Sequence, residues 1–330
     1  MNPSGGEDRS RTDDAEASPE DPDGYPEDPG GNPADPEPER NISGGEAGGG
    51  ARAAFEPGAA ETRAEAVVDR LGDLYWRKTY GGQDAFESLV RTILSQNTSD
   101  RVSQPAHEAL LERYGGGGGE SGAVGDVDGE GAAASEPADL AASLAAADHQ
   151  RLAETIESAG LYNQKASRIV AAAGWVREAF GSAAAFDEWV VETDPARVRE
   201  TLLELDGVGP KTADCVLLFG GGRSGVFPVD THVHRVARRL GIAPPDADHE
   251  GVREALEGEV PHEEFSNGGT DAIDGEEIHF RNGGVPPEKC GFGHTAMIQF
   301  GREYCTARKP ACLDGPEACP LSDLCERNGL

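Results

Sequence analysis

Lysine is scarce in this chain, and long apolar runs are missing. Only five of its 29 cationic residues are lysines, in 330 residues with a formal net charge of -32. No run of about 18 apolar residues occurs and the first residues are polar and acidic, so we expect no membrane span and no secretory signal. Acid-rich, lysine-poor surfaces suit concentrated salt, where self-repulsion is screened. The composition therefore predicts a halophilic, cytoplasmic protein.

The acidic excess is concentrated in three segments that are poor in large apolar side chains. Residues 1–60 form a Gly-, Pro- and acid-rich tail that cannot bury a core, so we predict that it is disordered. Residues 115–139 and 262–285 are Gly-rich, acidic inserts that we interpret as loops. The remainder has 34 acidic and 24 basic residues, and this weaker imbalance does not exclude a nucleic acid partner.

Apolar residues recur at helical spacing after the tail, whereas the alternation typical of strands is scarce. Asp84 and Glu87 match a capping box, and Asp148 precedes another periodic run. The pattern predicts an all-α protein of about ten helices. The apolar positions that carry it include Val67, Val68, Leu71, Leu74, Phe86, Leu89, Val90, Ile93, Leu152, Ile156, Ile169, Val170 and Val176.

A helix, hairpin, helix unit is expected over 198–219, with Gly207, Val208 and Gly209 in the hairpin and Thr212 in the next helix. The glycines allow close backbone approach and expose N–H groups at a helix start, which favours an anion such as a DNA phosphate. A tight turn between packed helices is the alternative. The dinucleotide fingerprint and the P-loop do not fit, because Thr212 replaces a third glycine and Pro210 precedes the lysine.

Lys211 and Asp230 are the candidate catalytic residues. Lys211 lies in the first turn of its helix, where the macrodipole and partial burial disfavour the ammonium and favour a nucleophilic amine. Such an amine suits Schiff-base chemistry, although a surface lysine is the alternative. Asp230 precedes a helix predicted over 231–240, and an N-cap role there is compatible with a catalytic one.

Four of the six cysteines cluster near the end of the sequence, with gaps of six, six and five residues between them: Cys305, Cys312, Cys319 and Cys325. Four thiolates can hold a [4Fe-4S] cluster, whereas zinc ligands usually come in closer pairs. Arg308 and Lys309 lie between them. Cys215 falls in an apolar run and is interpreted as a small buried residue; Cys290 has no assigned role.

The hairpin, the Val229–His232 segment and the clustered cysteines together resemble endonuclease III, within the helix-hairpin-helix-GPD DNA glycosylase superfamily. The resemblance covers roughly residues 61–327 apart from the inserts, and includes Thr92–Thr98 and Gly160–Lys165. The family's middle cysteine gap is two residues, whereas six residues separate Cys312 from Cys319 here. Extra loop residues cost little closure entropy, so an insertion between ligands is tolerable.

The resemblance implies a two-domain fold. A six-helix barrel domain would span 83–228 and contain the helix-hairpin-helix. An iron–sulfur cluster domain would combine 61–82 with 229–330, and DNA would lie between the two.

The resemblance also implies roles for single residues. Lys211 would attack C1′ of a flipped nucleotide, assisted by Asp230. Gln96 would fill the gap that the base leaves, with Asn97 as the alternative one position along. The [4Fe-4S] cluster would be structural. The DNA contacts would come from Gly207, Val208, Gly209, Thr212, His232, Arg308 and Lys309.

The expected protein is then a monomeric, nucleoid-associated enzyme that acts on double-stranded DNA with damaged bases or abasic sites. Oxidised pyrimidines enter as substrates only through the resemblance. Two alternatives stay open, a monofunctional mismatch glycosylase that uses water, and a non-catalytic DNA-binding module whose cluster senses redox state. The presence of Lys211 argues against the first alternative.

Overall fold

The structure is a computed structural model that describes residues 55–75, 84–98, 100–116, 139–259, 266–273 and 276–330. Most of the predicted tail and of the first insert lie outside these residues. The described part is mostly helical, which confirms the predicted fold class. Its α-helices are α1 (Arg63–Tyr75), α2 (Ala85–Ser95), α3 (Asp100–Tyr114), α4 (Leu140–Ala145), α5 (His149–Thr155), α6 (Tyr162–Ala179), α7 (Ala183–Glu192), α8 (Pro195–Leu203), α9 (Pro210–Cys215), α10 (Thr231–Arg239), α11 (His249–Glu257) and α12 (Cys290–Glu303).

Short helical turns connect these helices. The 3-10 turns are η1 (Pro57–Ala59), η2 (Glu157–Ala159), η4 (Pro287–Lys289), η5 (Ala311–Asp314) and η6 (Pro316–Ala318). A π-helical turn, η3 (Val216–Gly220), continues α9 directly. π-Turns often occur next to functional sites, and this one follows the helix that carries Lys211.

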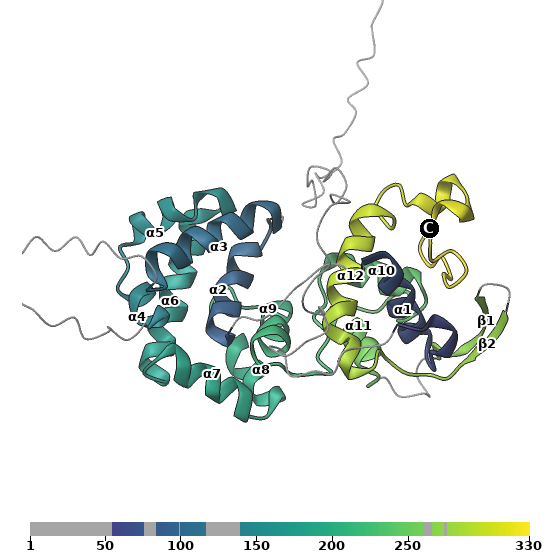
Figure 1. Cartoon of the computed structure of the whole chain (residues 1–330), viewed down its shortest axis with the longest axis horizontal. Coiled ribbons are helices and arrows are strands. Elements are labelled where there is room, and N and C mark those ends of the chain that lie inside the picture. The colour runs from purple at the N-terminus through teal and green to yellow at the C-terminus, as the bar shows by residue number, and fades with distance from the viewer. Residues whose placement is uncertain (1–54, 76–83, 99, 117–138, 260–265, 274–275) are drawn as a thin grey trace, which may run out of the picture.

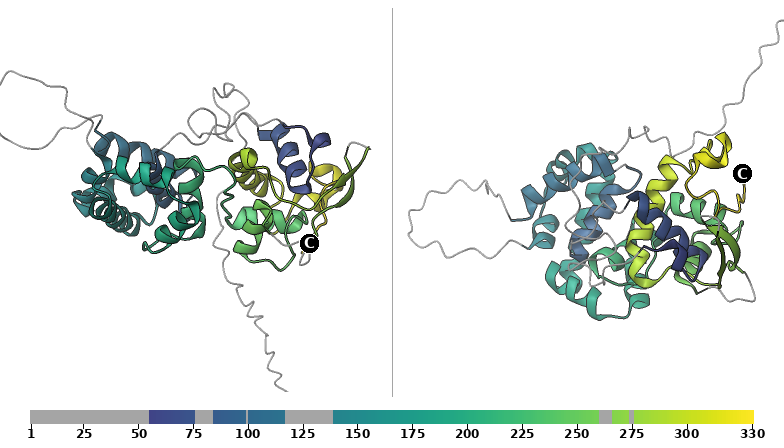
Figure 2. Two further views of the ribbon diagram at one scale, coloured as in Figure 1. Left: turned by 90° about the horizontal axis from the view of Figure 1, so that it is seen from below. Right: turned by 45° about the vertical axis from the view of Figure 1, so that its right-hand side comes forward.

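The buried apolar residues form two separate cores. Residues of α2 to α9 build the first core, whereas α1, α10, α11, α12 and the segment after α12 build the second. Figures 1 and 2 show the same two groups of helices, and Figure 1 places α9 between them. Val216 and Leu217 of η3 pack in the first core, and Leu218 packs in the second. The stretch from α9 to η3 therefore connects the two.

The second core begins earlier along the chain than the predicted domain boundary at 228/229. Leu218 and Phe227 were expected in the barrel domain, yet both are buried in the second core. Val226 packs against both cores. The change of core therefore takes place within η3, and the following residues already belong to the second set of helices.

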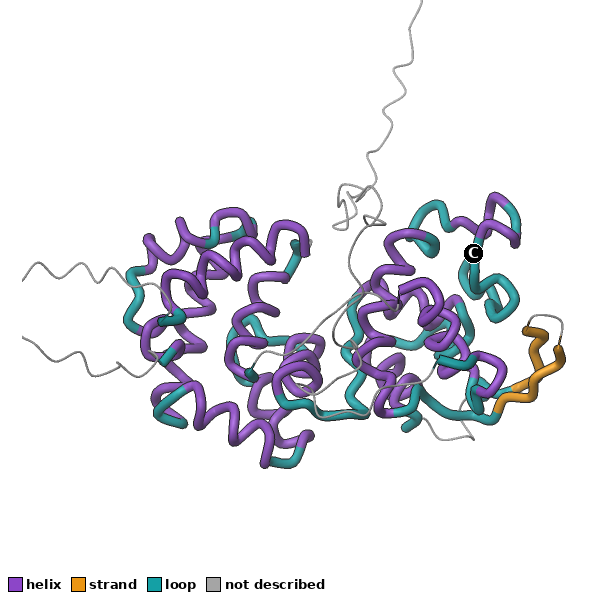
Figure 3. The backbone as a smooth tube through the Cα atoms, viewed as in Figure 1, coloured by secondary structure: helices purple, strands orange, loops and turns teal. Residues whose placement is uncertain are grey.

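The second acidic insert is not the loop predicted from its composition. It contains an antiparallel hairpin of β1 (Gly269–Ile273) and β2 (Glu276–Phe280), in which Gly269 pairs with Phe280 and Ile273 with Glu276 (Figure 3). Phe280 is buried in the second core and Ile278 packs against it. These two residues share one face of the strand because side chains alternate. The acidic residues around them hid this short pattern in the sequence.

One of the two predicted helix starts is confirmed and the other is wrong in its detail. Asp148 caps α5, since its carboxylate accepts from the Arg151 N–H at 2.9 Å. Asp84 precedes α2 but makes no side-chain cap bond. Asp187 of α7 accepts from the Phe86 N–H at 2.8 Å instead, and burial raises the pKa of Asp187 to about 6. A tertiary contact thus replaces the local capping box.

A buried ion pair joins α1 to the start of α12. Lys289 Nζ lies 2.6 Å from Asp69 and 2.8 Å from Glu65, and the Lys289 and Asp69 side chains are 8% and 1% exposed. Replacing Lys289 by Met leaves these carboxylates without their cation, so the free energy of unfolding should fall by about 3–5 kcal/mol. Urea denaturation at constant salt measures it. Lys309→Ala is the control, because its exposed pair with Asp314 should contribute less than about 1 kcal/mol.

Candidate active site

The hairpin between α8 and α9 has the conformation that its glycines predict. Gly207 has a φ of 78°, and a Cβ there would lie 2.3 Å from Nε of Arg168. The Val208 N–H bonds to the Leu205 carbonyl at 3.0 Å and closes the turn. Gly209 is extended and is the N-cap of α9. The positive φ favours glycine at position 207, and a Cβ there would require the Arg168 side chain to move.

The first turn of α9 has the geometry of an ordinary helix start. Pro210 occupies the first helical position, and the first backward bond runs from the Ala213 N–H to the Gly209 carbonyl at 3.0 Å. The Lys211 and Thr212 N–H groups precede that bond, as expected for the start of a helix. Lys211 is half-buried, whereas Thr212 is 4% exposed. An anion at this end would meet N–H donors and a favourable dipole.

Lys211 and Asp230 lie on different segments, and the charges of both act on Cys215. The Cys215 thiol is fully buried, and burial raises its pKa. Lys211 lowers that pKa through its charge and a side-chain hydrogen bond, and the charge of Asp230 raises it. Both residues therefore act on the same thiol. Cys215 is 2% exposed, as predicted for a small buried residue.

Asp230 is the N-cap of α10, as predicted. Its carboxylate accepts from the Val233 N–H at 2.8 Å. The side chain is half-buried. The cap bond uses Oδ1 of this carboxylate.

An ion network connects α9 to α8 and α11. Arg199 of α8 donates to Asp214 of α9 at 2.7 Å and to Glu250 of α11 at 2.8 Å. Burial raises the pKa of Asp214. Because α11 belongs to the second core, Arg199 links both cores at the helix that carries Lys211.

Gln96 and Asn97, the two candidates for the residue that fills the gap, differ sharply in the structure. Gln96 Nε2 donates to the Gly207 carbonyl at 2.7 Å and to Thr212 Oγ1 at 3.3 Å. Arg168 donates to Gln96 Oε1 at 3.1 Å. Gln96 is thus bound to the hairpin. Asn97 is exposed and has a φ of 52°, a left-handed conformation that asparagine tolerates.

Lys165 is a site residue to which the sequence analysis gave no role. It is 1% exposed, and its Nζ donates to the Leu94 carbonyl, Thr98 Oγ1 and the Ala159 carbonyl at 2.7, 2.8 and 2.7 Å. Burial lowers its pKa to about 8. The three bonds fix the turn that carries Asn97. The available signal was a lysine at a core-facing position of the helical repeat, next to buried Ala166.

The other predicted DNA contacts differ in how exposed their side chains are. Arg308 and Lys309 are exposed, as a contact with phosphates requires. His232 is 8% exposed and its Nδ1 accepts from Arg235 at 3.0 Å. A substituent at Gly301 of α12 would touch it, so His232 packs beneath α12 and presents little surface to DNA.

The clustered thiols lie near one another without forming a site for a single ion. Among the described residues, no three His, Cys, Asp or Glu side chains are grouped closely enough for one metal ion. Burial raises the pKa of Cys325 to about 11, and the other three thiols add to the rise. Cys305 accepts from buried Arg239 at 3.5 Å. Ligands around one zinc ion, each about 2.3 Å from it, crowd together, whereas a four-iron cluster holds each thiolate on a different iron and so spaces them further apart.

The six-residue gap between Cys312 and Cys319 is compact. It forms η5 and η6, with Gly315 between them at a φ of 131°. The Gly315 N–H bonds to the Cys312 carbonyl at 3.4 Å, and the Cys319 N–H to the Pro316 carbonyl at 3.2 Å. The additional residues therefore form two turns that lead the chain back to the other thiols.

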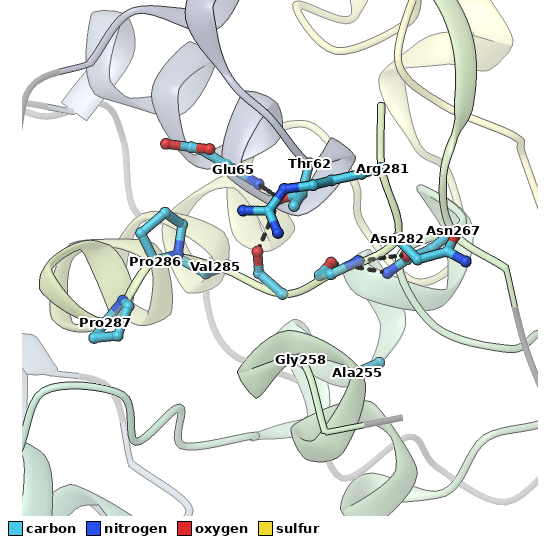
Figure 4. A pocket seen from close by; sticks show the side chains of 12 residues that line it. Thr62, Glu65, Ala255, Gly258, Asn267, Arg281, Asn282, Val285, Pro286 and Pro287 are labelled. Carbon is cyan, nitrogen blue, oxygen red and sulfur yellow. Dashed lines mark hydrogen bonds between the residues drawn. The ribbon is translucent and has the colours of Figure 1, made fainter. Parts of the chain in front are cut away.

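A separate cavity of about 400 Å3 lies among the residues around the second core (Figure 4). Thr62, Glu65 and Arg281 contribute polar groups to its lining, with Asn267 and Asn282. Neither Lys211 nor Asp230 lines it.

No helix among the described residues combines the length and apolar character needed to cross a bilayer.

Known proteins share both the fold and the sequence of these regions. The chain is 29% identical to endonuclease III of Thermotoga maritima over 246 residues, 74% of this chain and 83% of the relative. It is 27% identical to endonuclease III of Bacillus subtilis over 264 residues, 79% and 90% of the two chains. A non-covalent endonuclease III–DNA complex has a TM-score of 0.52 at 23% identity, covering 79% of this chain and 93% of that one. A thermostable thymine-DNA glycosylase has a TM-score of 0.52 at 16% identity, covering 81% and 96%. The two structures show the shared fold.

Two family models match the chain. Residues 305–325, which contain the four clustered cysteines, match the iron–sulfur binding domain of endonuclease III, and the cofactor of the chain is accordingly a [4Fe-4S] cluster. Residues 90–262, which carry the hairpin, Lys211 and Asp230, match the superfamily model. The chain belongs to the HhH-GPD superfamily of base excision DNA repair proteins.

Proposed function

We propose that this DNA glycosylase removes a damaged base from double-stranded DNA and then cleaves the strand at the resulting abasic site, with Lys211 as nucleophile and Asp230 as catalytic carboxylate. The observation that carries the proposal is a contact that joins the two segments. Cys215, one helical turn after Lys211, has its sulfur 4.0 Å from Nε2 of His294 in α12. Nδ1 of the same ring lies 2.8 Å from the carbonyl oxygen of Pro228, two residues before Asp230. A flipped sugar bound there would meet an amine and a carboxylate together.

The chemistry follows from these two groups. Base excision requires that the nucleotide first leaves the stack, at a cost of a few kcal/mol. The Lys211 amine then forms a bond to C1′ while the bond to the base breaks. Asp230 accepts a proton from the ammonium and stabilises positive charge on the sugar. Opening of the sugar gives a Schiff base, and loss of a C2′ proton expels the 3′ phosphate, leaving a nicked strand.

The hairpin supplies the phosphate contact in this proposal. Lys211 and Thr212 N–H groups, with the extended Gly209, form a donor surface that reads no base sequence. The Gln96 bonds to Gly207 and Thr212 hold that surface against the end of α2. Exposed Arg308 and Lys309 extend the contact from the cluster segment.

Asn97 is proposed as the residue that fills the gap left by the flipped base, because Gln96 is bound to the hairpin. Asn97→Ala should lower base release from a damaged duplex about tenfold, which corresponds to about 1.4 kcal/mol. It should change cleavage of a preformed abasic site by much less, since no paired base must then be displaced. The measurement is single-turnover cleavage of both duplexes.

Gln96→Ala provides the matched comparison. It removes the contacts with Gly207 and Thr212, so it should weaken both reactions to a similar extent. If Gln96→Ala impaired only base release, and Asn97→Ala had no effect, the assignment would be reversed.

The four clustered cysteines are proposed as the ligands of the [4Fe-4S] cluster, with Arg239 balancing part of their charge. When bound, the cluster supplies structure and no step of the reaction. Cys319→Ser should lose most of the bound iron and the visible absorbance of the cluster, while Cys290→Ser, outside the matched segment, should keep both. Iron analysis of the two purified proteins measures this. A full iron complement in Cys319→Ser would exclude Cys319 as a ligand.

We propose the two domains expected from the sequence, a barrel domain and a cluster domain, with the boundary between them within η3 in place of 228/229. The two separate cores support this division, with a transfer of Leu218 and Phe227 to the cluster domain. DNA would contact both domains where α9 connects them.

A panel of duplexes tests the function as a whole. One preparation is assayed on thymine glycol, 8-oxoguanine, uracil and an abasic site, with base release and strand cleavage measured separately. Release with cleavage supports the proposal. Release without cleavage supports the monofunctional alternative, and binding without either supports a DNA-binding module that senses redox state.

A further inference from the structure

The buried imidazole of His294 contacts both segments of the proposed active site. His294 belongs to α12 and is 2% exposed. Its Nδ1 lies 2.8 Å from the Pro228 carbonyl oxygen, and its Nε2 lies 4.0 Å from Cys215 Sγ. The rings of Phe219 and Phe227 border it, with centroids 5.9 and 6.4 Å away. The polar atoms of the imidazole thus meet one carbonyl and one thiol within apolar surroundings.

The direction of these hydrogen bonds follows from their partners. A carbonyl only accepts, so Nδ1 of His294 carries the proton and donates to Pro228. In the neutral imidazole Nε2 is then an acceptor. Burial raises the pKa of the Cys215 thiol, which therefore keeps its proton and can donate it toward Nε2. The sulfur remains free to accept from Lys211.

Lys211 and Cys215 lie one turn apart on the same face of α9, and Lys211 lowers the pKa of the Cys215 thiol. Cys215 contacts His294, and His294 contacts the Pro228 carbonyl. Pro228 lies two residues before Asp230, so this series of contacts begins at the proposed nucleophile and ends beside the proposed carboxylate. Asp214, the other acid that acts on Cys215, is held by Arg199 at 2.7 Å. The thiol and the imidazole therefore connect the two catalytic segments.

We propose that His294 is a positioning residue for the reaction: through Cys215 it holds the amine of Lys211, and through Pro228 it holds the segment that carries Asp230. The proposal rests on the proposed function. A lysine side chain has many rotamers, and a reacting amine must be held in a narrow range of positions. A neutral acceptor holds the amine without adding a second charge that would stabilise the ammonium.

The test uses the full-length protein with its cluster. The variants are His294→Phe, Cys215→Ala, Cys215→Ser and the double variant His294→Phe/Cys215→Ala. Cys290→Ala is the matched control, because Cys290 is also buried but bonds to the Val285 and Pro286 carbonyls. Two quantities are measured, the single-turnover cleavage rate of an abasic duplex at saturating enzyme and the Kd for a duplex with a tetrahydrofuran abasic analogue.

His294→Phe and Cys215→Ala should each lower the saturated rate about tenfold, an effect of positioning, while Kd changes less than about twofold. The saturated rate of the double variant should be no lower than that of the slower single variant, because both changes interrupt the same series of contacts. Cys215→Ser keeps a donor and an acceptor and should retain at least about threefold more rate than Cys215→Ala. Cys290→Ala should match the unmodified protein.

Several outcomes would overturn the proposal. These are saturated rates within twofold of the unmodified protein in both single variants, losses that multiply in the double variant, or a loss that appears only in Kd. If His294→Phe does not fold, His294→Asn replaces it, since a short amide keeps a donor for Pro228 but does not reach the thiol. Failure of the proposed function is distinguishable, because it appears as covalent trapping that persists without Lys211.

Discussion

Lys211→Ala is expected to abolish the covalent protein–DNA adduct that borohydride traps on an abasic duplex. Reduction fixes a Schiff base only if an amine of the protein has bonded to C1′. Strand cleavage should fall by on the order of 10³-fold or more, because no other group supplies the nucleophile. The adduct is counted on a denaturing gel, and cleavage is followed under single-turnover conditions.

DNA binding should survive the same substitution. The proposed phosphate donors are the backbone N–H groups at the start of α9, and they remain when the side chain is shortened. The Kd for an uncleavable abasic duplex should therefore change by less than about fivefold, or about 1 kcal/mol. Lys309→Ala also removes an amine, at an exposed position, and is the control for the adduct only: it should still form the adduct at saturating enzyme, even where its Kd rises.

The opposite result would redirect the proposal. A persistent adduct in Lys211→Ala would show that another amine reacts with the sugar. Base release by Lys211→Ala at an unchanged rate, with no adduct in the unmodified protein, would support the monofunctional alternative.

The sequence predicted the helical fold because its apolar positions recur with helical periodicity and are buried as a result. Val67, Leu71, Leu89 and Ile93 are all fully buried. It missed the β-hairpin at 269–280, where only a few apolar side chains face the core. It also misassigned the cap of α2, since Asp187 comes from α7 and a contact between distant segments leaves no local pattern.

The candidate site was predicted in part for the same reason. The hairpin conformation follows from local glycine chemistry, and Asp230 as N-cap follows from its position before a helix. The different environments of Gln96 and Asn97 could not be predicted, because Gln96 bonds to the Gly207 carbonyl, which comes from a distant segment. His294 lies 64 positions beyond Asp230 and has no local signal. The halophilic setting and the DNA contacts of Arg308 and Lys309 stay predictions.

Asp230→Asn is expected to separate the two roles of this residue. Asparagine caps a helix about as well as aspartate, so the bond to the Val233 N–H can be kept and the free energy of unfolding should change by less than about 1 kcal/mol. The negative charge is lost. Base release should then fall about 10²- to 10⁴-fold, the usual contribution of a group that takes a proton in the transition state.

Asp230→Ala completes the comparison because it removes both the charge and the cap. It should lose about 1 kcal/mol of stability in urea denaturation, while its base release matches that of Asp230→Asn. If the two variants have equal activity but unequal stability, the negative charge of Asp230 acts in catalysis and its cap bond acts in the stability of α10. Full activity in Asp230→Asn would instead leave Asp230 as a cap alone, and the ammonium of Lys211 would then need another proton acceptor.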